Sequence, residues 1–86
     1  MKQLEKILKS LANSRRLQAI SFIKQRKKPT VGEIAEHLKL SFSATSRHLS
    51  LLENAGILDK KQSSLEVRYF IASQLPKEIS TIVDNL

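Results

Sequence analysis

The spacing of the apolar residues changes at Gly56, and this change constrains the fold more than any other feature of the chain. Before Gly56, apolar residues recur at the three- and four-residue spacing of helices that bury one face. After it, residues 57–62 and 66–71 alternate as strands do, with Val67, Tyr69 and Ile71 on one face. Helical spacing returns over residues 76–86. The pattern predicts an α+β domain that is mostly helical.

Start and stop signals divide the part before Gly56 into four helices. The first covers residues 2–12, and Asn13 or Ser14 can cap the second. The second ends in the basic stretch 26–28, because Pro29 forces the residue before it out of helical geometry. Thr30-Val31-Gly32-Glu33 is a capping-box pattern that opens a short third helix. Ser41 begins the fourth helix, and Gly56 ends it as a C-terminal cap.

The expected order is four helices, a hairpin that turns near residues 63–64, and a last helix over 76–86. Two short helices joined by a tight turn at 39–41 and followed by a basic hairpin are typical of a winged helix-turn-helix. A chain of 86 residues has room for one such domain. We therefore expect a single DNA-binding domain over 1–86, with the terminal helices 2–12 and 76–86 serving dimerisation.

The charge favours a polyanionic partner. The chain carries a net charge of +7, and the part before residue 29 holds one acidic residue, Glu5, against nine basic ones. These are Lys2, Lys6, Lys9, Arg15, Arg16, Lys24, Arg26, Lys27 and Lys28. Neutralising phosphates with such groups releases counterions, although a merely soluble basic surface has the same composition.

Composition argues against several other classes. With no cysteine, the chain has no disulfide, no thiolate metal site and no cysteine nucleophile. It also lacks a Gly-rich phosphate loop and a convincing His–carboxylate pair, so we expect no enzyme and no cofactor. No apolar run approaches the roughly 20 residues of a membrane span, and the first residues do not form a signal peptide. We expect a cytoplasmic protein with no membrane partner.

Residues 40–58, LSFSATSRHLSLLENAGIL, resemble the arsenic-repressor-like (ArsR/SmtB) family of winged-helix regulators. The matching positions are Leu40, Ser41, Ser43, Ser46, His48, Leu49, Leu52, Ala55 and Gly56. Upstream, residues 8–13 and Arg16-Leu17 are similar to the opening of the family pattern, and Val67-Arg68-Tyr69 is similar to the end of its wing. The resemblance covers about residues 4–71. It implies a transcriptional regulator, most often a repressor.

The fourth helix has the features of a recognition helix. Its inward stripe is the Thr45 methyl, Leu49 and Leu52, while small hydroxyls and Arg47 project outward near its start. Arg47 suits a bidentate contact with guanine, or else it is a solvated surface arginine. The candidate DNA contacts are Ser43, Ala44, Thr45, Ser46, Arg47 and His48 in this helix, Lys27, Lys28 and Thr30 before the third helix, and Lys60, Lys61 and Arg68 in the wing.

Several of these residues have alternative interpretations. His48 is either a DNA contact, a switch near neutral pH, or a structural histidine bonded to a neighbouring backbone. Phe42 either packs under the helix-turn-helix turn, which we favour, or touches a thymine methyl. The wing and loop cations suit phosphates, but a solvated hairpin edge uses the same residues. Arg16 is expected to tie the second helix to the core.

The family's sensor residues are missing. Metal-sensing members carry a Cys-Val-Cys-like element where this chain has Thr30-Val31-Gly32, and their other ligands include histidine on the last helix, which has none here. We therefore expect no metal site and no thiol sensor. The resemblance also assigns the terminal helices to a two-fold interface, although their stripes could instead cover the chain's own core. The stripe residues are Leu4, Ile7, Leu8, Leu11, Ile79, Ile82, Val83 and Leu86.

The sequence thus predicts a sequence-specific regulator of double-stranded DNA, a repressor in our interpretation, that binds an inverted repeat as a homodimer. The alternatives are a winged-helix module that binds protein and a non-specific nucleic-acid-binding protein.

Overall fold

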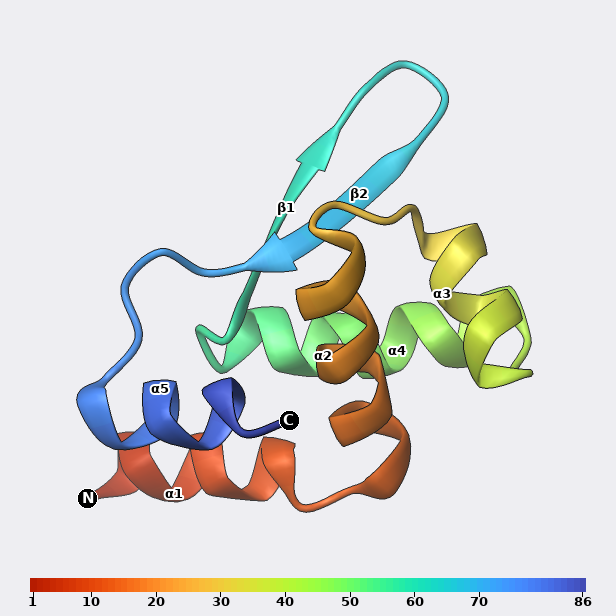
Figure 1. Cartoon of the computed structure of the whole chain (residues 1–86). Coiled ribbons are helices and arrows are strands. Elements are labelled where there is room, and N and C mark those ends of the chain that lie inside the picture. The colour runs from red at the N-terminus through yellow and green to blue at the C-terminus, as the bar shows by residue number, and fades with distance from the viewer.

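A computed structural model describes all 86 residues and has the predicted winged helix-turn-helix order (Figure 1). The helices are α1 (Lys2–Leu11), α2 (Ser14–Arg26), α3 (Val31–Leu38), α4 (Phe42–Asn54) and α5 (Lys77–Asp84), and the strands are β1 (Leu58–Gln62) and β2 (Val67–Ile71). No helix is both long and apolar enough to cross a membrane. The fold class that the sequence predicts is confirmed.

The helices begin at the predicted caps. The Asn13 side chain accepts a hydrogen bond from the backbone N–H of Arg16 at 3.1 Å, which starts α2. At α3, the Thr30 N–H donates to Glu33 Oε1 at 2.8 Å and the Glu33 N–H donates to Thr30 Oγ1 at 3.1 Å. This reciprocal capping box satisfies two amides that have no partner within the helix.

Left-handed residues end the two helices of the helix-turn-helix. After α4, Gly56 has φ 82°, and the N–H of Ile57 donates to the Leu52 carbonyl at 3.0 Å. Lys39 has φ 57° after α3 and directs the Leu40 N–H to the Ala35 carbonyl at 3.1 Å. Both ends have the bonding pattern of a Schellman cap, which reverses the chain sharply. The cap at Lys39 makes the turn between α3 and α4.

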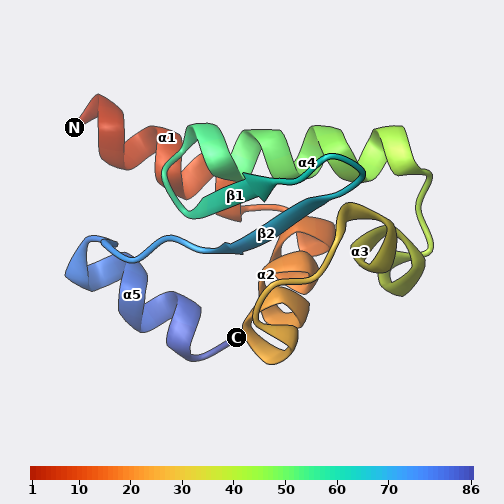
Figure 2. The same cartoon turned by 90° about the horizontal axis from the view of Figure 1, so that it is seen from above.

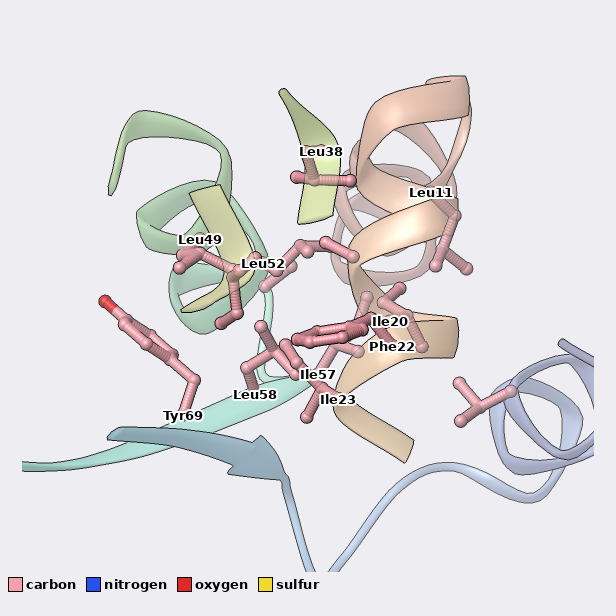
Figure 3. Close-up of a cluster of buried hydrophobic side chains, with 14 of the residues drawn as sticks. Leu11, Ile20, Phe22, Ile23, Leu38, Leu49, Leu52, Ile57, Leu58 and Tyr69 are labelled. Atoms are coloured by element: carbon pink, nitrogen blue, oxygen red, sulfur yellow. The ribbon is translucent and has the colours of Figure 1, made fainter. Parts of the chain in front are cut away.

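One hydrophobic core joins the helices to the wing (Figure 3). Ile20 and Ile23 of α2 are fully buried, as are Leu49 and Leu52 of α4. Tyr69 of β2 is 4% exposed and closes the core on the side of the wing. The core therefore sets the position of α4 relative to the wing.

The wing is anchored to the start of α3. Strands β1 and β2 pair antiparallel, from Leu58 opposite Ile71 to Gln62 opposite Val67. The loop before α3 runs beside β2, where the Tyr69 N–H donates to the Pro29 carbonyl at 3.0 Å. Figure 2 shows this loop and the hairpin close together above α2. The hairpin thus has a defined direction relative to α3 and α4.

The terminal helices are only partly available to a second protomer. Of the eight side chains predicted for the dimer interface, Ile7, Leu11, Ile79 and Val83 are buried in the chain's own core, so their assignment to the interface is wrong. Leu4, Leu8 and Ile82 are 40%, 46% and 39% exposed, and Leu86 is half-buried. Each stripe is wide enough to cover the core along one edge and still leave apolar side chains at the surface. In Figure 1, α1 and α5 lie at the end of the molecule opposite the wing tip.

Candidate nucleic-acid interface

Helix α4 presents a polar ridge to solvent. Because Thr45, Leu49 and Leu52 face the core, a helix of about 3.6 residues per turn directs the opposite face outward. We call this face the α4 ridge, and it consists of Ser43, Arg47, Ser50 and Asn54, all of them exposed. Arg47 has no ion-pair partner in the chain. Its guanidinium is therefore available for a contact outside the protomer.

One predicted contact in α4 is wrong. Thr45 has no exposed surface, and its Oγ1 has no hydrogen-bond partner. It follows the period of the buried stripe, so its whole side chain, and not only the methyl, faces the core. Ala44 and Ser46 lie on the flanks of α4 and are half-buried, so they can reach a partner only at the edges of the ridge.

His48 is held by an arginine side chain and not by a backbone group. Arg16 of α2 donates from Nε to the Ser10 carbonyl at the end of α1, at 2.6 Å, and its Nη1 lies 3.2 Å from His48 Nδ1. Since a guanidinium only donates, His48 accepts at Nδ1 and carries its proton at Nε2. Arg16 thus joins α1, α2 and α4, in agreement with its predicted structural role.

The surroundings of His48 keep it neutral. Partial burial lowers its pKa below the ordinary value, and the positive charges of Arg16, Arg15 and Arg47 lower it further. A neutral Nε2–H can still donate to a phosphate or a base. The structure therefore supports the structural role of His48 without removing a DNA contact.

Phe42 does not pack under the turn. It is 63% exposed at the first position of α4 and lines a hollow of about 220 Å³ with residues of α3 and the wing, among them Gly32 and Leu65. Leu65 at the wing tip is 93% exposed. The packing interpretation is thus wrong, because the core beneath α4 is already filled by Leu49 and Leu52. Contact with a thymine methyl stays a prediction.

The loop before α3 is strained and basic. Lys27 has φ 77° and ψ −67°, and the Lys28 N–H donates to the Arg26 carbonyl at 3.0 Å, which makes a γ-turn of the rare positive-φ form. Lys27 and Lys28 are exposed.

The Thr30 hydroxyl, in contrast, belongs to the capping box with Glu33. These hydrogen bonds lower the pKa of Glu33, first through the Thr30 backbone and then through its side chain.

The wing cations differ in how free they are. Lys60 pairs with Glu53 of α4 at 3.5 Å. Arg68 donates to the Lys28 carbonyl at 2.9 Å and to Glu66 Oε1 at 3.2 Å, so it connects β2 to the loop before α3. Lys61 is exposed and has no ion-pair partner. Lys61 is therefore the freest of the three for a phosphate.

Sequence reasoning missed two basic side chains that close helix ends. Arg15 donates to the Leu38 carbonyl in the last turn of α3. Lys24 donates from Nζ to the carbonyls of Val83 and Asp84 at 3.0 and 2.9 Å, and so closes the end of α5. Cations favour helix C-termini, but the partners are 23 and 59 or 60 residues away, so no local pattern predicts them. No three His, Cys, Asp or Glu side chains lie close enough to hold a metal ion.

The two capped helices, the exposed ridge on the second of them and the anchored hairpin define a winged helix-turn-helix protein. Residues 13–60 match the family described as "Bacterial regulatory protein, arsR family". The chain belongs to the arsR family of bacterial regulatory proteins. It is a transcriptional regulator and not an enzyme.

Individual relatives agree with this assignment. The chain is 32% identical to the transcriptional activator HlyU of Vibrio cholerae over 80 residues, which are 93% of this chain and 73% of HlyU. A structure of HlyU superposes with a TM-score of 0.82 and 30% identity over 98% of this chain and 87% of that one. The structure of the transcriptional repressor PagR of Bacillus anthracis superposes with a TM-score of 0.78 and 25% identity, over 98% of this chain and 92% of that one.

A third structure shares the fold at lower identity. It is a homodimeric winged helix-turn-helix DNA-binding domain from Mycobacterium bovis, with a TM-score of 0.83 and 24% identity over 98% of this chain and 74% of that one.

Proposed function

We propose that the chain binds double-stranded DNA in a sequence-specific way as a homodimer and represses transcription by occupying an inverted repeat. The α4 ridge carries this proposal, since it is a polar, exposed helix face with an unpaired arginine. A major groove about 12 Å wide admits such a helix, and the fork of Arg47 matches the two acceptors of a guanine edge. The regulator would work in the cytoplasm, where a bacterium keeps its DNA.

The exposed apolar side chains of the terminal helices support a homodimer. An interface between two copies would remove three exposed apolar side chains from contact with water: Leu4 and Leu8 of α1 and Ile82 of α5. The structure from Mycobacterium bovis is described as homodimeric, which favours the same assembly here. A two-fold axis at this end would place the two α4 helices about one DNA turn apart, about 34–36 Å, and would require an inverted repeat.

Selection of binding sites from a random duplex pool tests the proposal. We expect an inverted repeat to be enriched. Arg47→Ala should then reduce the preference for the selected site over a scrambled one by about 1–3 kcal/mol. Arg47→Lys is the matched control for charge: it should lose the same preference but keep the salt dependence. If Arg47→Ala left the preference unchanged, Arg47 would not read a base.

Salt dependence tests whether phosphates contribute. A dimer making six to ten phosphate contacts should lose roughly 10³- to 10⁵-fold in affinity between about 50 and 200 mM salt. Lys61→Ala should weaken all duplexes alike and reduce the log–log slope by about one unit per protomer. A flat log–log plot would contradict DNA binding and favour the alternative of a module that binds protein.

A metal is not part of the proposed mechanism. The family's first ligand positions hold Thr30 and Gly32, and the last helix has no histidine. Added zinc should therefore neither bind tightly nor release the selected DNA. Submicromolar zinc affinity coupled to DNA release would contradict this part of the proposal.

A further inference from the structure

A basic groove lies between α1 and α4, on the side of α4 away from the wing. It has a volume of about 680 Å³ and is lined by Lys2, Lys6 and Lys9 of α1, by Arg16 of α2, and by Leu51 and Asn54 of α4. We call it the α1–α4 groove. Glu5 also lines it, but that carboxylate is 3.5 Å from Lys9, so Lys2, Lys6 and Arg16 have no carboxylate partner. None of these lysines was among the predicted DNA contacts.

The groove is continuous with the α4 ridge. Asn54 belongs to both, and Leu51, 45% exposed, lies on the flank of α4 that faces α1. The other flank faces the wing, where Glu53 pairs with Lys60. Figure 1 shows α4 between the wing above and α1 below, and Figure 2 shows α1 and α4 along the same side of the molecule. The ridge therefore has cations on both of its sides.

We propose that the α1–α4 groove binds the phosphates of the DNA strand that lies on the side of α4 opposite the wing. This rests on the proposed function, in which α4 enters a major groove. A helix in a major groove has a phosphate backbone on each side, and the wing can reach only one of them. The lysines of α1 are placed for the other.

The spacing of the lysines fits a backbone and not a single small anion. From Lys2 to Lys9 the helix rises about 10 Å, and over that length of the duplex axis one DNA strand carries about three phosphates. Arg16 is fixed at the end of this row by its bonds to Ser10 and His48.

Lys2 and Lys6 lie apart from the face of α1 proposed for dimerisation. Leu4 and Leu8 line a second, mostly apolar hollow together with Met1 and Ala12; Glu5 and Lys9 border both hollows, whereas Lys2 and Lys6 line only the α1–α4 groove. A lysine variant can therefore remove a phosphate contact without removing an apolar side chain from the interface. Its dimeric state, checked by sedimentation, should equal that of the wild type.

The test compares the salt dependence of two single-charge variants on the duplex obtained by selection. Lys6→Gln should reduce the slope of log affinity against log salt concentration by about 0.9 per protomer. Between about 50 and 200 mM salt, the loss of affinity should therefore be about 3.5-fold smaller than in the wild type for each contact removed. Lys77→Gln on α5 is the matched control, because Lys77 is also exposed but lies outside the groove. Its slope should equal that of the wild type. In the double variant K2Q/K6Q the reduction in slope should be about twice that in the single variant.

Phosphate ethylation locates the contact. Ethylation on the strand opposite the wing should interfere with binding of the wild type and not with that of K2Q/K6Q. The proposal is overturned if Lys6→Gln keeps the wild-type slope; should Lys61→Gln lower the slope in the same experiment, DNA binding by the ridge and the wing would still stand. A flat slope for the wild type itself would instead overturn the proposed function, and the groove proposal with it.

Discussion

Replacing Thr45 by valine should stabilise the protein. Thr45 has no exposed surface, and its Oγ1 is a buried polar atom with no hydrogen-bond partner. Leaving such a hydroxyl without a partner costs about 1–3 kcal/mol in proteins. Valine has the same shape and a similar helix propensity, so it removes this cost without a cavity or a change in backbone preference. We expect the free energy of unfolding to rise by about 1–2 kcal/mol.

Urea denaturation measures the effect, with both proteins at one concentration because association contributes to apparent stability. For a domain of this size, 1 kcal/mol corresponds to a Tm shift of about 4–8 °C. Thr45→Ser is the matched control: it keeps the hydroxyl and loses the methyl, so it should destabilise by about 1 kcal/mol. If Thr45→Val were equally or less stable than the wild type, the hydroxyl would have a partner and the reasoning would be refuted.

The same variant separates stability from recognition. A fully buried side chain makes no contact with DNA, so Thr45→Val should keep the wild-type preference for the selected duplex over a scrambled one. A clear loss of that preference would mean that α4 turns on binding and exposes position 45.

Three further changes have defined outcomes. Lys27→Gly should raise the free energy of unfolding, measured by urea denaturation, by about 1 kcal/mol, because glycine adopts φ 77° without strain. Lys27→Ala should not raise it. Equal stabilisation by both variants would contradict backbone strain at this position. Folding lowers the pKa of His48, so the stabilising contribution of the neutral side chain is present above the unfolded-state pKa and is lost on acidification. As the pH is lowered from about 7.5 to about 5.5, the free energy of unfolding of the wild type should therefore fall, and that of His48→Gln should fall less. The same pH slope in both proteins would contradict this. Ile82→Asp should dissociate the dimer and leave weak half-site binding, because it would bury a charge in the interface. A wild type that sediments as a monomer at concentrations on the order of tens of micromolar would contradict the dimer itself.

Local sequence determined the elements and their ends. Asn13, the Thr30–Glu33 box and Gly56 act between neighbours in the chain, so their patterns can be recognised without a fold. The change of apolar period at Gly56 likewise reports only which face of each segment is buried. For this reason the order of helices and hairpin, the helix-turn-helix and the outward direction of Arg47 all followed from the sequence.

Tertiary structure decided how wide apolar stripes are shared and which polar groups meet. Periodicity shows that α1 and α5 are amphipathic, but only packing shows that Ile7 and Val83 are used internally while Leu4 stays exposed. The bonds from Arg16 to Ser10 and His48 join three helices, and the α1–α4 groove lies between segments about forty residues apart in the chain. Such contacts depend on how the helices pack, because the residues that meet carry no mutual signal in a single sequence.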